Sequence, residues 1–134
     1  MPSQIIIDAT DGIMGRIASF AAKQSLLGKE VVIVNCNQTL ITGRPRTAIT
    51  NYQQKRSRGG SSLKGPHFPK SPERIMKRTV KGMLSHRQAR GRDALKRVIC
   101  YNKVPAEFEN AEKISLKREI KVKALTLKKL SEEL

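Results

Sequence analysis

The N-terminal part of the chain has the hydrophobic pattern of two strands separated by a helix. Residues 4–8 form a short run of β-branched apolar residues that ends in a carboxylate, which is typical of a buried strand. Residues 14–27 repeat their apolar positions at helical spacing, and Gly28 follows as a C-terminal stop. Residues 31–34 are again continuously apolar. A strand, a helix and a strand at this spacing predict a βαβ unit, and therefore a parallel sheet with a right-handed crossover.

The next segment predicts a further strand and a second helix. Residues 39–42 form another short strand-like run. Pro45 suits the first turn of a helix, because a backbone N–H is not needed at that position. Three side chains of this helix are expected to face the core, and these are Ala48, Ile49 and Tyr52.

Regular structure is expected to stop between residues 57 and 70, where glycine, proline and basic residues dominate. A loop of this length in a compact domain is usually functional or disordered. Ser71, Pro72 and Glu73 then supply a cap, a first-turn proline and a first-turn acid, so a helix should begin there and run to about Met83. Its expected apolar stripe consists of Ile75, Met76, Thr79, Val80 and Met83.

Short elements are expected to follow as far as the end of the chain. A basic, glycine-containing link at residues 85–92 leads to a helical turn around Ala94 and Leu95. The remaining expected elements are a buried strand at residues 98–101, a loop at 103–113, a half-exposed edge strand at 118–123 and a short helix capped by Thr126 that carries Leu127, Leu130 and Leu134. The whole pattern predicts one α/β domain over residues 1–134, with a small, mainly parallel sheet of about four strands.

Positive charge is concentrated in the middle of the chain. The chain carries a net charge of +16, from 27 Lys and Arg and 11 Asp and Glu. Residues 44–97 hold sixteen of the basic residues but only two acids, Glu73 and Asp93, so their net charge is +14 and the rest of the chain carries +2. Such a segment repels itself unless a polyanion neutralises it. Nucleic acid is the commonest polyanion, because each phosphate that a basic side chain neutralises releases counterions.

The basic residues fall into three groups: one around the helix after Pro45, one in the long loop, and one on the helix that starts near Ser71 and in the link behind it. On this last helix four basic residues are spaced i, i+3, i+4 and i+7 and therefore share one face. A solvated helix face normally mixes both signs of charge, and the companion acids are missing here. We therefore expect these residues to bind RNA. The candidate RNA-binding residues are Arg16, Arg44, Arg46, Lys55, Arg56, Arg58, Lys64, His67, Lys70, Arg74, Lys77, Arg78, Lys81, Arg87, Arg90 and Arg92.

Aromatic residues are few, and their scarcity bears on the mode of binding. The sequence has no Trp, and its rings are Phe20, Tyr52, Phe68, Tyr101 and Phe108. Binding by base stacking needs exposed rings beside the cations, so recognition of phosphate and of shape is favoured over a stacking platform. A cationic protein-interaction or membrane-surface module is an alternative. The membrane version is disfavoured, because it needs a strongly amphipathic helix with bulky aromatics and the sequence offers none. We expect neither a membrane partner nor a homo-oligomer.

The turn after the first strand raises the alternative of a nucleotide-dependent enzyme. Gly12 and Gly15 match the second and third glycines of the dinucleotide-binding fingerprint, but Thr10 occupies the place of the first. The carboxylates of Asp8 and Asp11 would repel a pyrophosphate. The favoured interpretation is structural: Gly12 permits a tight turn, and Gly15 lets the helix pack closely on the strand.

The cysteines and histidines do not form a metal-binding pattern. Cys36, His67, His86 and Cys100 stand far apart, whereas structural zinc ligands come in close pairs. Both cysteines lie in or beside apolar runs, which is typical of buried free thiols in a reducing compartment. We expect no metal, no cofactor and no catalysis. No apolar stretch reaches the length of a secretory or membrane-spanning segment, so a cytoplasmic location is expected.

An ordered set of short motifs runs through about residues 5–108. The motifs are Asp8-Ala9, Gly15-Arg16-Ile17-Ala18, Val31 to Asn35, Thr42-Gly43, Tyr52, Gly65-Pro66, Val80-Lys81-Gly82-Met83-Leu84, Arg90-Gly91-Arg92, Ala94-Leu95 and Tyr101. The set resembles the universal large-subunit ribosomal protein family that carries number thirteen in the bacterial naming. Residues 85–87 and 103–108 lack the proline and histidine patterns of the bacterial branch, so the resemblance is to the archaeal and eukaryotic branch.

The resemblance implies a three-layer α/β/α fold and no catalysis. It implies a structural constituent of the large ribosomal subunit that binds and stabilises large-subunit ribosomal RNA, aids subunit assembly and has neighbouring large-subunit ribosomal proteins as further partners. Carried over by position, the RNA-facing side comprises the helix start at Thr42-Gly43-Arg44, the Gly/Pro loop, and Val80 to Leu84 together with Arg90-Gly91-Arg92.

Overall fold

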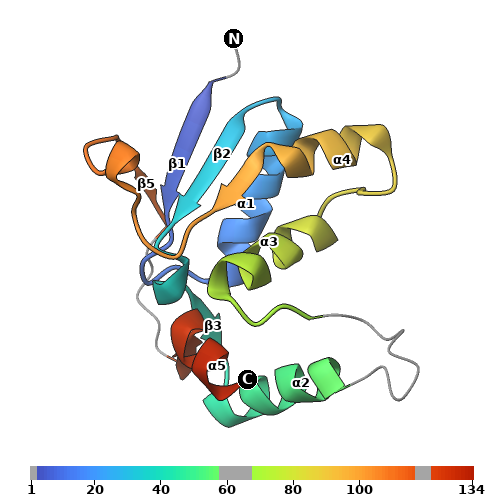
Figure 1. Cartoon of the computed structure of the whole chain (residues 1–134), viewed down its shortest axis with the longest axis vertical. Coiled ribbons are helices and arrows are strands. Elements are labelled where there is room, and N and C mark those ends of the chain that lie inside the picture. Colours follow the sequence, from blue (N-terminus) through green and yellow to red (C-terminus); the bar gives the residue numbers. More distant parts are fainter. Residues whose placement is uncertain (1–2, 58–67, 117–121) are drawn as a thin grey trace.

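The computed structural model describes residues 3–57, 68–116 and 122–134, and these residues are built around a four-stranded parallel sheet (Figure 1). The strands are β1 (Gln4–Asp8), β2 (Glu30–Val34), β4 (Val98–Cys100) and β5 (Ile114–Ser115), in the order β4-β2-β1-β5. β1 pairs in parallel with β2 and β5, and β2 pairs in parallel with β4. The predicted α/β fold with a small, mainly parallel sheet is therefore confirmed.

Both faces of the central strands are buried, which explains why their sequences are continuously apolar. Ile7 and Ile33 point into the hydrophobic cluster that the sheet shares with α1 (Met14–Leu26). Ile6 and Val32 point the other way, into a second cluster. That second cluster also contains Val34 and the partly buried side chains of Tyr101, Val104, Phe108 and Ala111.

The two faces of the sheet are covered differently. On one face α1 packs with α3 (Pro72–Gly82) and α4 (Ala89–Lys96), and all three helices place side chains in the main cluster. On the other face residues 101–111 cover the sheet, and they contain the short 3-10 helix η3 (Ala106–Phe108). The sheet thus lies between a layer of α-helices and a thinner layer around η3.

A smaller group of elements lies beside the sheet. β3 (Leu40–Thr42) pairs antiparallel with β6 (Ala124–Thr126), and α5 (Leu127–Glu133) follows β6 directly. Thr126 caps α5 as predicted, because its hydroxyl accepts a hydrogen bond of 3.2 Å from the Lys129 amide. α5 buries its leucines, Leu127 and Leu130, in a third hydrophobic cluster.

α2 (Pro45–Ser57) rests on this smaller group through one side only. Ala48, Ile49 and Tyr52 pack against the third cluster, as predicted. No residue of α2 is fully buried, however, so most of the helix surface faces solvent. In Figure 1 α2 lies below α3, and residues near its C-terminal end share a pocket with α3 that is described below.

Pairing of the short strands departs from the sequence prediction. The strand expected at residues 39–42 is present as β3, but it joins β6 and not the parallel sheet. The fourth strand of the parallel sheet is β5, whose two residues give no periodic signal. The edge strand expected at residues 118–123 lies largely outside the described residues.

The expected link at residues 85–92 is shorter than predicted. α4 already begins at Ala89, and Ala94 anchors it in the main cluster. Met83, expected in the apolar stripe of α3, is 45% exposed, because α3 ends at Gly82 and the chain turns there. Burial in the core and not local periodicity sets the length of both helices.

Candidate nucleic-acid interface

α3 carries apolar and basic side chains on opposite sides. Its apolar residues Ile75, Met76 and Val80 are buried, which fixes the orientation of the helix against the sheet and α1. This orientation turns the other side of the helix to solvent. The exposed basic residues of α3 are Arg74, Arg78 and Lys81.

Lys77 differs from the other basic residues of α3. Its side chain is half-buried, and its ammonium group donates a hydrogen bond of 2.8 Å to the Val98 carbonyl of β4. This charge therefore helps to hold α3 against the sheet. The single basic face that helical spacing predicts is divided, with one member turned inward.

The residues before and within α4 extend the basic surface. Arg87, Arg90 and Arg92 are all exposed, and Arg92 donates a hydrogen bond of 3.1 Å to the Arg87 carbonyl. α4 lies close to the chain that precedes it because Gly91 is buried there. A Cβ atom on Gly91 would collide with the Ser85 carbonyl.

α2 and its flanks supply a third set of cations beside α3. Arg56 donates a hydrogen bond of 3.3 Å to the Phe68 carbonyl and so ties the end of α2 to the segment that enters α3. Lys55 is half-buried, whereas Arg56 is exposed. Exposed basic residues at the flanks of the two helices are Arg44, Arg46 and Lys70.

The first turn of α1 also lies beside α3. The Thr79 hydroxyl contacts the Met14 sulfur at 3.6 Å, and Arg16, two residues further along, is exposed. The remaining predicted site residues, Arg58, Lys64 and His67, lie outside the described residues.

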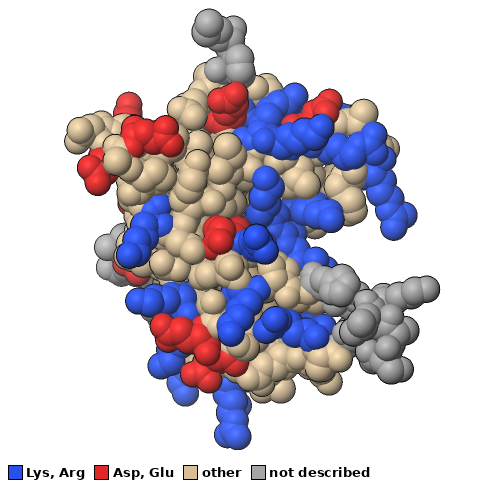
Figure 2. Space-filling view, viewed as in Figure 1, with Lys and Arg blue, Asp and Glu red and all other residues tan. Residues whose placement is uncertain are grey.

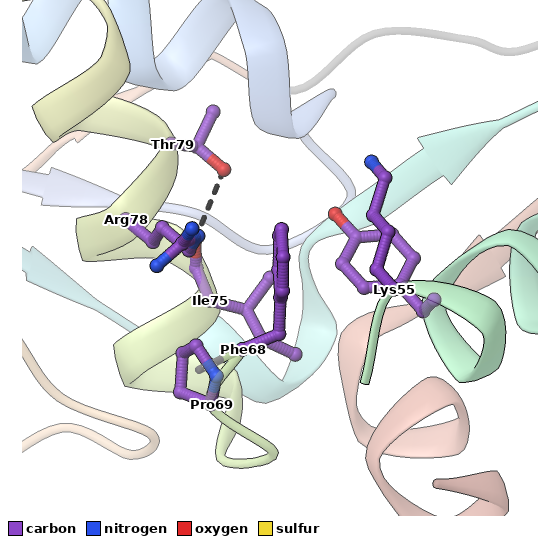
Figure 3. Close-up of a pocket in the computed structure, with 7 residues that line it drawn as sticks. Lys55, Phe68, Pro69, Ile75, Arg78 and Thr79 are labelled. Carbon is purple, nitrogen blue, oxygen red and sulfur yellow. Dashed lines mark hydrogen bonds between the residues drawn. The ribbon is translucent and has the colours of Figure 1, made fainter. Parts of the chain in front are cut away.

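A pocket of about 190 Å³ opens between the end of α2 and α3, and we name it the α2–α3 pocket (Figure 3). It is lined mainly by Tyr52, Lys55, Phe68, Ile75 and Arg78. The Arg78 guanidinium carbon lies 3.9 Å from the centroid of the Phe68 ring, and the Lys55 ammonium lies 5.7 Å from it. The same ammonium is 5.3 Å from the centroid of the Tyr52 ring. Both cations are therefore within the range of cation–π attraction.

Sequence reasoning assigns Tyr52 to the core and gives Phe68 no role, so it does not predict that the two rings line one pocket. Burial raises the pKa of Tyr52 and the nearby Arg78 charge partly offsets this, so the phenol stays neutral at physiological pH. The only sequence signal was that Phe68, between His67 and Pro69, is an aromatic residue inside the basic segment. Its proximity to Tyr52 depends on how α2 and α3 pack.

Acidic and basic side chains are unevenly distributed on the molecular surface. Figure 2 shows blue side chains over α3 and α4 and also over the lower part of the molecule, and red ones gathered at the upper left over the segment that contains η3, with smaller red groups elsewhere. The acids of this segment are Glu107, Glu109 and Glu112, all exposed. The described surface formed by α2, α3 and α4 is therefore strongly cationic.

In the turn after β1 the Asp8 carboxylate accepts several hydrogen bonds. Asp8 accepts hydrogen bonds from the Thr10 amide and hydroxyl at 3.0 and 2.6 Å, and from the Asn35 side chain at 3.0 Å. Burial by itself raises the pKa of Asp8, but these hydrogen bonds and the Lys113 charge outweigh it and hold the pKa below its ordinary value. An ionised carboxylate here would repel a pyrophosphate.

The glycines of this turn have different roles from each other. A Cβ atom on Gly12 would lie 2.6 Å from Ile17 Cδ1, so a larger residue there would have to displace the buried Ile17 side chain. A Cβ atom on Gly15 would meet nothing within 4 Å, so the prediction that Gly15 allows close packing is wrong. The close packing in this turn is therefore between Gly12 and Ile17.

The two cysteines are free thiols that neighbour each other. Cys36, in the 3-10 helix η1 (Cys36–Gln38), is buried, and Cys100 is half-buried. A hydrogen bond with Cys100 and burial both raise the pKa of the Cys36 thiol, and a protonated thiol is a poor nucleophile and a poor metal ligand. In the described part of the chain no cluster of three or more His, Cys, Asp and Glu could hold a metal ion.

Comparison with known proteins agrees with the ordered motifs. The sequence model of the family described as Ribosomal protein L13 matches residues 3–107. The chain belongs to this family. The L13 resemblance drawn from the motifs is therefore confirmed.

Relatives named large ribosomal subunit protein uL13 match most of the chain. The protein of Methanosarcina barkeri is 46% identical over 112 residues, which cover 83% of this chain and 79% of the relative. That of Haloarcula marismortui is 39% identical over 134 residues, covering 98% and 91%. That of Thermoplasma volcanium is 39% identical over 132 residues, covering 96% of each chain. All three organisms are archaea, in agreement with the expected branch.

Membership in the L13 family decides between the alternatives that the sequence left open. The family consists of structural, non-enzymatic components of the ribosome, so the interpretation of the Gly12 turn as a nucleotide-dependent active site is abandoned. Among the described residues, no helix combines the length and the apolar character needed to cross a bilayer.

Proposed function

We propose that this L13-family chain is a structural constituent of the large ribosomal subunit that binds and stabilises large-subunit ribosomal RNA and aids assembly of the subunit. Its relatives are named as large-subunit proteins, which supports the proposed location in the large ribosomal subunit. Neighbouring large-subunit proteins are its other partners, and the chain acts as a single copy.

The observation that carries the proposal is the outward-facing charge of α3. Arg74, Arg78 and Lys81 are exposed on the side opposite to the buried stripe. Between residues 68 and 92 the one acid is Glu73, and it is half-buried. Because companion acids are missing from this segment, its surface keeps a strong net positive charge until a polyanion approaches.

The proposed mechanism of RNA binding depends on how firmly α3 and α4 are held in the fold. α3 and α4 are held by the main cluster, so their cations are presented on a fixed surface and not on freely moving chains. Arginine forms planar, bidentate contacts with phosphate, which favours defined positions along an RNA backbone. Release of counterions from the RNA supplies much of the free energy of binding.

Equilibrium binding to a transcript of the source organism's large-subunit ribosomal RNA, measured at a series of salt concentrations, tests the proposal. We expect a steep linear fall of log K with log salt for the wild-type chain. Replacing Arg74, Arg78 and Lys81 by Gln should lower the magnitude of this slope by about 3, since each lost phosphate contact removes about one unit.

A matched control removes the same amount of charge elsewhere. Lys23, Lys103 and Lys128 are exposed and lie outside residues 44–97. Replacing these three by Gln should leave the salt slope close to that of the wild type. An equal loss of slope in both triple variants would show that general charge, and not the α2–α3–α4 surface, governs binding.

A further inference from the structure

The α2–α3 pocket combines two features that the rest of the basic surface, as far as the structure describes it, does not bring together. It lies between the cationic helices, and its walls include two aromatic rings. Cations alone hold phosphates, but rings are the groups on which unstacked bases lie in protein–RNA complexes. The pocket therefore has groups that could contact a base as well as groups that could contact phosphates.

The Phe68 ring has a cation near each face, and only Arg78 is in close contact with it. Arg78 lies against one face, with its guanidinium carbon 3.9 Å from the ring centroid. Lys55 stands further off, at 5.7 Å, and Figure 3 shows the ring edge-on between these two side chains. Lys55 also lines the pocket and lies 5.3 Å from the centroid of its second ring, Tyr52. A base that stacks on the face opposite Arg78 displaces the Lys55 ammonium toward the adjoining phosphate.

The size and chemistry of the cavity suit a single aromatic ring system. Its volume is about 190 Å³, and protein cavities of roughly 150 Å³ admit a benzene ring. Ile75 supplies an apolar wall, and the Thr79 hydroxyl already donates a hydrogen bond of 3.0 Å to the Ile75 carbonyl. The neutral Tyr52 phenol can both donate and accept a hydrogen bond at the edge of a base.

We infer that the α2–α3 pocket takes one unstacked nucleobase of RNA, which stacks on the Phe68 ring while Lys55 and Arg78 contact the adjoining phosphates. The inference rests on the proposed function, since the base is delivered by an RNA backbone bound across α2 and α3. The scarcity of rings in the sequence still holds for the surface as a whole, and stacking is confined to this one position.

Three RNA hairpins that differ at one nucleotide test the inference with the full-length chain. One carries a single bulged 2-aminopurine, the second carries an abasic site at the same bulge, and the third is fully paired. Stacking of a base on an aromatic side chain contributes about 1–3 kcal/mol. We therefore expect about 5- to 150-fold tighter binding of the bulged base than of the abasic bulge. The 2-aminopurine fluorescence should fall on binding because stacking quenches it.

Two variants locate the effect in the pocket. Phe68→Leu keeps an apolar side chain but removes the ring, and it should abolish most of the preference for the base, measured as the ratio of the affinities for the bulged and the abasic hairpins. Arg78→Lys changes an exposed residue, so it leaves the core intact. It keeps the charge but removes the planar group, and it should weaken the preference in the same direction. Arg74→Lys, on the same helix but outside the pocket lining, is the matched control and should keep the full preference.

The outcomes separate this inference from the proposed function. Salt-dependent binding of equal strength to the bulged and abasic hairpins would overturn the pocket inference alone. Full retention of the preference by both Phe68→Leu and Arg78→Lys would overturn it as well. Failure to bind any of the three hairpins would also overturn the pocket inference, whereas the proposed function fails only if the chain does not bind the large-subunit ribosomal RNA transcript or binds it without salt dependence.

Discussion

Gly91 shows how one missing side chain positions part of the basic surface. It is buried in the first turns of α4, directly against the backbone at Ser85 and His86. Any larger residue would push α4 away from this backbone. Arg90 and Arg92 flank Gly91, so their placement depends on this close approach.

Replacing Gly91 by Ala should destabilise the protein by about 1–3 kcal/mol, the usual cost of forcing an extra group into a filled space. Gly82→Ala is the control, because a Cβ atom there meets nothing within 4 Å. It should change stability by less than about 1 kcal/mol. Urea unfolding of both variants measures the difference, and equal stabilities would disprove the tight approach at Gly91.

The residues of α3 show what periodicity can and cannot predict. Helical spacing correctly places Ile75, Met76 and Val80 in the core, because burial of a stripe follows from the 3.6-residue repeat. The same spacing groups Lys77 with the exposed cations. Helical spacing does not reveal that a carbonyl of β4 lies within hydrogen-bond distance of the Lys77 ammonium, because this contact joins segments far apart in the sequence.

The edge of the parallel sheet explains why Lys77 turns inward. β4 is an edge strand, and the Arg97 carbonyl at its start accepts a hydrogen bond from the Val31 amide of β2. Carbonyls alternate in direction along a strand, so the Val98 carbonyl points away from β2. The Lys77 ammonium covers this carbonyl and links α3 to the sheet.

Lys77→Met should therefore lower the free energy of unfolding by about 1–2 kcal/mol through the lost charged hydrogen bond. It should leave the salt slope of RNA binding nearly unchanged, because this ammonium is already engaged. Arg74→Met removes the same charge from an exposed position of the same helix. It should keep stability and lower the magnitude of the slope by about 1. Denaturant titration and salt-dependent binding measure both, and the reverse pattern would contradict the assigned roles.

Helices and strands can be predicted where a buried face gives the sequence a clear hydrophobic periodicity. β1, α1, β2, α2, α3 and α5 were all found within one or two residues of their expected positions. The sequence predicts neither β5 nor the pairing of β3 with β6, because strands of two or three residues are defined by non-local pairing. α4 was underestimated because its helix depends on contacts of Gly91 and Ala94 with distant segments.

At the scale of the whole molecule, composition predicts a cationic surface, and packing determines which of its charges face outward. The +14 of residues 44–97 pointed to the part of the chain that forms the cationic side, but not every charge in it faces outward. Besides Lys77, Arg97 is used internally and donates a hydrogen bond of 2.8 Å to the Ser25 carbonyl. The α2–α3 pocket was not predictable, because it forms only when α2 and α3 bring Tyr52 and Phe68 together.

The central claim is that this L13-family chain is held in the large ribosomal subunit by its basic α2–α3–α4 surface. Sucrose-gradient sedimentation of a lysate of the source organism tests it most directly, with a tagged copy followed at moderate and then at high salt. We predict that the wild-type chain co-migrates with large subunits through the salt step. The variant with Arg74, Arg78 and Lys81 replaced by Gln should be released to the top of the gradient at high salt. A wild-type chain that stays at the top at both salt concentrations, or a variant retained as firmly as the wild type, would contradict the account.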